Sequence, residues 1–170
     1  MTLISAVPAP GMAVFVFTMV YAGLTDLTTM KIRNGLVVLF LLAYAVLAPF
    51  AGFSIAEIGW SVVVAAGVLA VAFVLFVRGW IGGGDAKLAA VTALWLGADH
   101  TAAYLMFAAL LGGAFTLAIV LFRMQTLPAW MDRSWIARLH AQEAGIPYGV
   151  ALAVAALVVF PETRWMTVFS

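Results

Sequence analysis

Six apolar runs, separated by short polar breaks, occupy most of this chain and restrict the folds that it can adopt. They cover residues 8–25, 35–53, 58–77, 86–98, 102–122 and 146–160. A membrane-spanning helix needs about 20 predominantly apolar residues, whereas a membrane β-barrel shows many short alternating strands. Charged residues make up only 9% of the 170, too few to cover a water-soluble domain of this size. We therefore predict a single all-α domain, residues 1–170, that forms a polytopic membrane protein with six transmembrane helices.

Composition also limits the partners and the chemistry of the chain. There is no cysteine, and the two histidines, His100 and His140, lie in separate predicted loops, so neither a metal nor another cofactor is expected. The net charge of +1 argues against nucleic acid and leaves the lipid bilayer as the predicted surroundings. No basic residue precedes Lys31, so the first run lacks the charged start of a secretion signal and is predicted to be a retained span.

The distribution of Lys and Arg predicts how the spans are oriented. Six spans place alternate connections on opposite sides of the membrane, and one side receives seven of the eight basic residues. These seven are Lys31, Arg33, Arg78, Lys87, Arg123, Arg133 and Arg138, and only Arg164 falls on the other side. Because cytoplasmic loops carry an excess of Lys and Arg, the first side is predicted to be cytoplasmic and both termini to lie outside.

The connection before the last run has the pattern of an amphipathic helix. Apolar residues recur every four positions, at Leu127, Met131, Trp135 and Leu139, and charged residues occupy other positions. Helices of this kind lie in the membrane interface with their aromatic rings at the headgroup level. Residues 127–145 are therefore predicted to form a cytoplasmic interfacial helix that anchors the chain, with contact to a substrate as the alternative role.

Two carboxylates, Asp26 and Asp85, lie at cytoplasmic ends of predicted spans that are distant in the sequence. A helical rise of ~1.5 Å per residue places each of them several ångströms inside a hydrocarbon core about 30 Å thick. Carboxylates at such depth are costly and usually mark a functional site. Two adjacent carboxylates hold one proton between them, so one can activate a water while the other polarises a carbonyl and protonates the leaving amine. The pair therefore predicts hydrolysis of a peptide bond.

The three glycines Gly82–Gly84 directly precede Asp85. We expect them to let the backbone bend, approach a substrate strand closely and adopt positive φ, with Asp85 favoured by the N-terminal dipole of the following helix. Two simpler interpretations stay open. The glycines and Asp85 could form only a turn with an N-cap, and Asp26 could pair with Lys31 or Arg33 to hold the loop.

Three motifs, taken together, resemble those of the prepilin peptidases, a family of aspartic membrane proteases with a Gly-x-Gly-Asp signature. "GGGDAKL" at residues 82–88 resembles the Gly-x-Gly-Asp-x-Lys motif at a span entrance. "DLTTMKIRNGL" at 26–36 is similar to the first catalytic segment, an Asp followed by Ile-Pro-Asn, except that Arg33 replaces the proline. "GIPYGVALA" at 145–153 resembles the segment that opens the last span. Motif order, six spans and orientation agree over essentially the whole chain.

The resemblance implies an aspartic endopeptidase of the bacterial inner membrane with Asp26 and Asp85 as its catalytic residues. Its substrates would be type IV prepilins, in which a basic leader precedes an apolar helix, cut at the cytoplasmic face. The absence of cysteine and the short loop after Asp26 are typical of the short form associated with Flp/Tad-type pili. Longer members of the family also N-methylate the new amino terminus, but this chain has no glycine loop of the nucleotide-binding type, so this activity is not expected here. The sequence does not predict an oligomeric state. The candidate substrate-positioning residues are Gly82, Gly83, Gly84, Lys87 and Asn34.

Alternatives remain for several of these roles. Lys87 is predicted to anchor the chain at the interface or to orient substrate, and Asn34 to hydrogen-bond near the site or to cap the second helix. Gly145 and Gly149 are predicted to permit close helix packing, and His100 to be structural. A small proton-coupled transporter or pilus-assembly membrane subunit is the alternative function, but transporter carboxylates lie nearer the midplane, often in repeated halves.

Overall fold

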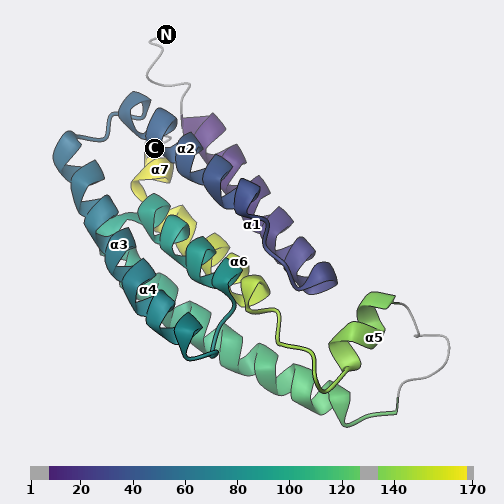
Figure 1. Ribbon diagram of the computed structural model, residues 1–170. Helices are drawn as coiled ribbons and strands as arrows, with labels where there is room; N and C mark the ends of the chain where they lie inside the picture. The colour runs from purple at the N-terminus through teal and green to yellow at the C-terminus, as the bar shows by residue number, and fades with distance from the viewer. Residues whose placement is uncertain (1–7, 127–133, 168–170) are drawn as a thin grey trace.

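A computed structural model describes residues 8–126 and 134–167, and every regular element in these ranges is helical, which confirms the predicted all-α class (Figure 1). The long helices are α1 (Pro8–Thr29), α2 (Asn34–Phe50), α3 (Ile55–Val77), α4 (Gly83–Arg123) and α6 (Tyr148–Val159). The short ones are α5 (Ser134–His140), the 3-10 turn η3 (Phe160–Glu162) and α7 (Arg164–Thr167).

The longest element, α4, consists of two helices that meet at Gly97. This residue has φ 78° and ψ 176°, a backbone conformation that glycine adopts without steric cost and other residues avoid. The chain reverses there, so the second half of α4 runs back along the first (Figure 1). Both ends of α4 therefore lie at the same end of the molecule, as the prediction of two separate runs, 86–98 and 102–122, requires.

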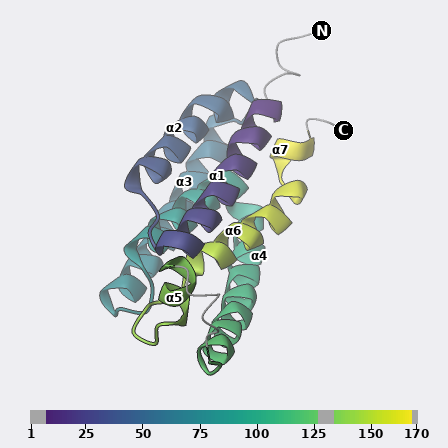
Figure 2. The same cartoon turned by 90° about the vertical axis from the view of Figure 1, so that its right-hand side faces the viewer.

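Six helical segments, counting α4 as two, alternate in direction through the described part of the chain (Figures 1 and 2). Three helices, covering 10–29, 55–77 and 83–123, are long and apolar enough to cross a membrane. Two shorter apolar helices cover 34–50 and 148–162. Large apolar side chains such as Val63 and Phe73 are more than half exposed, as expected for a surface that faces lipid. The crossing of the membrane by all six segments, with both termini outside, stays a prediction.

An aromatic cluster sets the register between α1 and the first half of α4. The indole of Trp95 stacks on Phe40 at 4.8 Å and meets Phe15 edge-on at 5.8 Å, and its Nε1–H donates to the Phe40 carbonyl. Asp26 lies 11 residues after Phe15, about 16 Å along α1, and Asp85 lies 10 residues before Trp95, about 15 Å along α4. The cluster thus holds the two carboxylates at matching levels.

The predicted interfacial helix over residues 127–145 is wrong beyond His140. Residues 127–133 lie outside the described residues, and α5 ends at His140. The Arg123 guanidinium donates to the carbonyls of Leu139, Ala144 and Gly145 at 2.8–3.0 Å, which folds the chain after α5 into turns rather than helix. A position of α5 in the membrane interface stays a prediction.

Candidate active site

Asp26 is a buried carboxylate in the last turns of α1, with only 4% of its surface exposed. Its Oδ2 accepts a hydrogen bond of 2.8 Å from the backbone N–H of Gly149. Gly149 is the second residue of α6, so this N–H is one of the donors that a helix start leaves without an intrahelical partner. A Cβ at position 149 would lie 2.7 Å from Asp26 Oδ2, so only glycine allows this approach.

Asp85 lies in the first turn of α4, at a second helix N-terminus, where the helix dipole favours a carboxylate. Its Oδ2 folds back onto Gly82, where an added Cβ would lie 2.8 Å away. Its Oδ1 is buried and has no hydrogen-bond partner among the described residues. Asp26 and Asp85 line the same two pockets. The structure therefore brings the two predicted carboxylates together.

The α1–α2 connection wedges Ile32 between the two helix N-termini. A Cβ on Gly84 would lie 3.0 Å from Ile32 Cβ, and a Cβ on Gly149 would lie 2.9 Å from Ile32 Cδ1. Glycine at these two positions permits the close packing of backbone that draws the carboxylates together. A Cβ added at Gly83 would likewise lie 3.1 Å from the ring of Phe76.

The expectation of positive φ at Gly82–Gly84 is wrong. Gly82 is the N-cap of α4 with φ −71°, and Gly83 and Gly84 begin the helix. In this turn it is Gly79, three residues earlier, that has φ 73°. Glycine is needed beside Asp85 because neighbouring atoms leave no room for a side chain, and not because the backbone has an unusual conformation. The N-cap of α4 is Gly82 rather than Asp85, and the interpretation of this segment as only a turn with an N-cap stays open.

Lys87 and Asn34 form a hydrogen bond across the site, from Lys87 Nζ to Asn34 Oδ1 at 2.9 Å. Asn34 is the first residue of α2, whose N-cap is Arg33 and has no capping side-chain bond. Of the two roles open for Asn34, the structure shows the hydrogen bond near the site. Lys87 therefore ties the start of α2 to α4.

Two adjoining pockets of about 380 and 410 Å³ flank the carboxylates, and Asp26 and Asp85 line both. The first is also lined by Trp80, Ile146 and Tyr148. The second is lined by the α1–α2 connection and the glycines before Asp85. Each pocket has room for water and a segment of extended chain next to the pair.

Asp26 forms no ion pair with Lys31 or Arg33, so that alternative is wrong. Within the described ranges the one ion pair joins Arg164 to Glu57, at the opposite end of the molecule. These ranges hold no group of three or more His, Asp and Glu side chains that could bind a metal ion. The site offers chemistry through its paired carboxylates and the backbone around them.

Sequence reasoning missed the contact between Gly149 and Asp26. Both Gly145 and Gly149 were predicted to permit helix packing, but Gly145 precedes α6 and has nothing within 4 Å of an added Cβ. Arg138, on α5, was also missed: its Nη1 donates to the Thr28 carbonyl at 2.8 Å, two residues beyond Asp26. The Ile-Pro-Tyr-Gly segment at 146–149 was the available signal for Gly149, whereas nothing in the sequence indicated Arg138.

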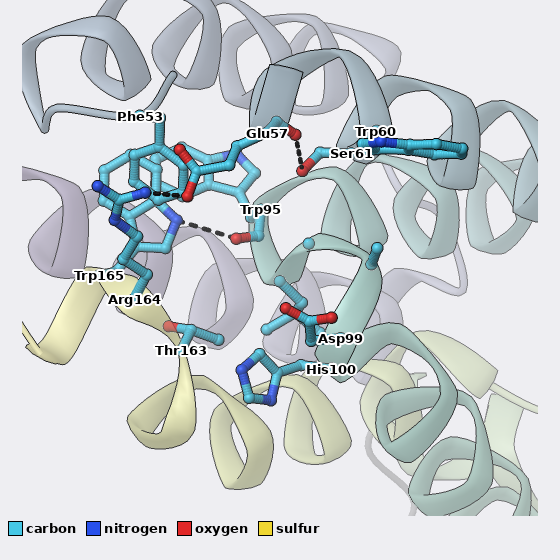
Figure 3. A pocket seen from close by; sticks show the side chains of 13 residues that line it. Phe53, Glu57, Trp60, Ser61, Trp95, Asp99, His100, Thr163, Arg164 and Trp165 are labelled. Carbon is cyan, nitrogen blue, oxygen red and sulfur yellow. Dashed lines mark hydrogen bonds and ion pairs between the residues drawn. The ribbon is translucent and has the colours of Figure 1, made fainter. Parts of the chain in front are cut away.

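A third pocket, of about 330 Å³, lies at the opposite end of the molecule, near Gly97 (Figure 3). Asp99 and His100 line it from α4, and Arg164 pairs there with Glu57 and donates to the Gly52 carbonyl. These contacts tie the end of the chain to the α2–α3 turn, and a structural role for His100 stays a prediction. The oppositely charged pair here contrasts with the two like carboxylates of the candidate site.

A known protein family matches the part of the chain that holds the two carboxylates. The sequence profile of the Type IV leader peptidase family matches residues 13–117. This stretch includes Asp26, Asp85 and the glycines, whereas Gly149 lies beyond it. Searches of curated proteins and of solved structures found no match.

Proposed function

The chain belongs to the type IV leader peptidase family, and from this premise we propose that it is an aspartic endopeptidase with Asp26 and Asp85 as its catalytic pair. One observation carries the proposal. Carboxylates 59 residues apart in the chain meet at two helix N-termini, and one oxygen of Asp85 is buried without a partner among the described residues. Membership in a peptidase family favours this function over a proton-coupled transporter or an assembly subunit.

Hydrolysis at the pair needs one proton on the two carboxylates. The ionised carboxylate removes a proton from a water as the water oxygen bonds to the carbonyl carbon of the scissile peptide. The protonated carboxyl gives its proton to the carbonyl oxygen. As this tetrahedral intermediate collapses, one of its hydroxyls returns a proton to the carboxylate that had given one, the C–N bond breaks, and the proton taken from water passes to the leaving nitrogen. The pair then again holds a single proton.

The distribution of charge supports cleavage at the cytoplasmic face. Basic residues at the carboxylate end include Lys31, Arg33, Arg78, Lys87, Arg123 and Arg138. Arg164 lies at the opposite end, beside Gly52. An excess of Lys and Arg marks the cytoplasmic side of a membrane protein, the side on which the basic leader of a prepilin would remain.

The connection between α1 and α2 supports the short, Flp/Tad-type form of the enzyme. Only residues 30–33 separate the two helices, and they pack into the site through Ile32. This connection is too short for the extra cytoplasmic region with paired cysteines that many longer prepilin peptidases carry between their first spans. We therefore propose Flp/Tad-type prepilins as substrates.

Processing of a co-expressed prepilin tests the function. Leader removal, followed by gel mobility, should be lost with Asp26→Asn and with Asp85→Asn, which keep the side-chain shape but remove the charge. Asp99→Asn, an exposed carboxylate at the opposite end, is the matched control and should process normally. Processing that survives both site substitutions at normal protein levels would rule out the proposed catalytic pair.

A further inference from the structure

An apolar groove of about 510 Å³ opens beside the carboxylates, between α3, both halves of α4, and α6. Asp85, Ile81 and Tyr148 form one end of it and also line one of the two pockets at the pair. Beyond this end the lining is aliphatic. The groove is therefore continuous with the candidate active site and leads away from it along the bundle.

The groove has the length and surface that suit a helix. On α3 its lining runs from Leu75 to Val64, 11 residues or about 16 Å, roughly half of a 30 Å hydrocarbon core. Small residues, among them Gly67, Ala108 and Ala151, line its walls. Small side chains let the backbones of neighbouring helices approach closely in a membrane.

We propose that this groove docks the apolar helix that follows the cleavage site of the substrate, an inference that rests on the proposed function. A peptide bond held at Asp85 continues toward the bilayer, and the groove begins at that residue. Backbone at membrane depth must satisfy its own hydrogen bonds, so the segment that enters the groove is helical. A lipid acyl chain would match the apolar lining but would bring no peptide bond to the carboxylates.

Docking in the groove would align the substrate with the catalytic pair. The helix would fix how far the chain before it reaches toward Asp85, and thereby which peptide bond lies between the carboxylates. Tyr148 lies where groove and pocket join, and its hydroxyl accepts a hydrogen bond from Thr116 at 3.4 Å. The ring of Tyr148 would separate the helical part of the substrate from the extended part.

Two matched substitutions on α3 test the groove. Gly67 lines it and Gly59 does not, and an added Cβ meets nothing within 4 Å at either position. Leucine is a better helix former than glycine, so Gly67→Leu and Gly59→Leu should both fold. The purified enzymes are compared on a prepilin with its apolar helix and on a shorter peptide that keeps the leader, the scissile bond and a few residues after it but lacks the rest of the helix.

The preference for the long substrate is the ratio of its kcat/KM to that of the short one. We expect Gly67→Leu to lower this ratio about tenfold, because the KM of the long substrate rises. Gly59→Leu should keep the wild-type ratio. If the wild-type enzyme cleaves neither substrate, the proposed function is wrong. If it cleaves both and Gly67→Leu keeps the wild-type ratio, the function stands and the docking proposal is wrong.

Cross-linking gives a second measurement that does not depend on catalysis. The chain has no cysteine, so Gly67→Cys and Gly59→Cys each introduce a single thiol. In the Asp26→Asn background, and with an added thiol oxidant, a prepilin with one cysteine in its apolar helix should form a disulfide with position 67 and not with position 59. Equal cross-linking at both positions, or none at 67, would show that the substrate helix does not dock in the groove.

Discussion

Asp26, near the end of α1, accepts a hydrogen bond from the backbone N–H of Gly149, 123 residues later at the start of α6. A helix N-terminus thus supplies the donor that orients one carboxylate, and the N-terminus of α4 carries the other, Asp85. Backbone dipoles at both helix ends stabilise negative charge without a basic side chain. Among the described residues, neither carboxylate forms an ion pair.

Gly149→Ala should abolish most leader removal while the protein still reaches the membrane. The new methyl would lie 2.7 Å from Asp26 Oδ2 and 2.9 Å from Ile32 Cδ1, so the hydrogen bond must break or α6 must shift. Overpacking of this kind costs about 1–3 kcal/mol of unfolding free energy. Gly145→Ala, with open space around its Cβ, is the control and should process normally. Equal processing by the two variants would contradict the contact.

Lys87→Met and Asn34→Ala should each reduce processing several-fold, and the double variant should be no worse than either single one. Both remove the same 2.9 Å hydrogen bond, which holds the start of α2 to α4. An exposed bond of this kind contributes about 0.5–1.5 kcal/mol. The measurement is a double-mutant cycle on the rate of leader removal. Strictly additive effects would show that the two side chains act independently.

Gly97→Ala should lower the stability of the fold. Position 97 has φ 78° and ψ 176°, a conformation essentially restricted to glycine, and holding another residue there costs roughly 1–3 kcal/mol. Gly113→Ala, in the second half of α4 with nothing within 4 Å of its Cβ, should instead stabilise the helix by up to about 1 kcal/mol. Thermal unfolding in detergent should therefore shift in opposite directions for the two variants. A shift in the same direction would argue against the reversal at Gly97.

Arg164→Gln should leave leader removal unchanged. Its ion pair with Glu57 is about half exposed, 44% for each side chain, and lies at the end opposite the carboxylates. Exposed pairs contribute about 0–1 kcal/mol, so a small loss of thermal stability is the expected result. A large loss of processing with normal protein levels would instead connect this end of the molecule to the reaction.

The amino-acid sequence alone determined where the helical segments lie and that the two carboxylates lie at the same end of them. Helix length and apolar content are local properties, so the runs that became α1, α3 and both halves of α4 were visible without tertiary contacts. The charge bias likewise placed Asp26 and Asp85 at one end, because it depends only on which connection holds each basic residue.

Only the tertiary structure decided how the site is assembled. The Gly149 hydrogen bond, the wedge of Ile32 against Gly84, and the end of α5 at His140 each depend on segments that are far apart in the chain. The sequence predicts that the glycines before Asp85 give the backbone conformational freedom. In the structure they instead leave room for neighbouring residues such as Ile32. Hydropathy and charge describe what each segment does alone, but close packing depends on which segments meet.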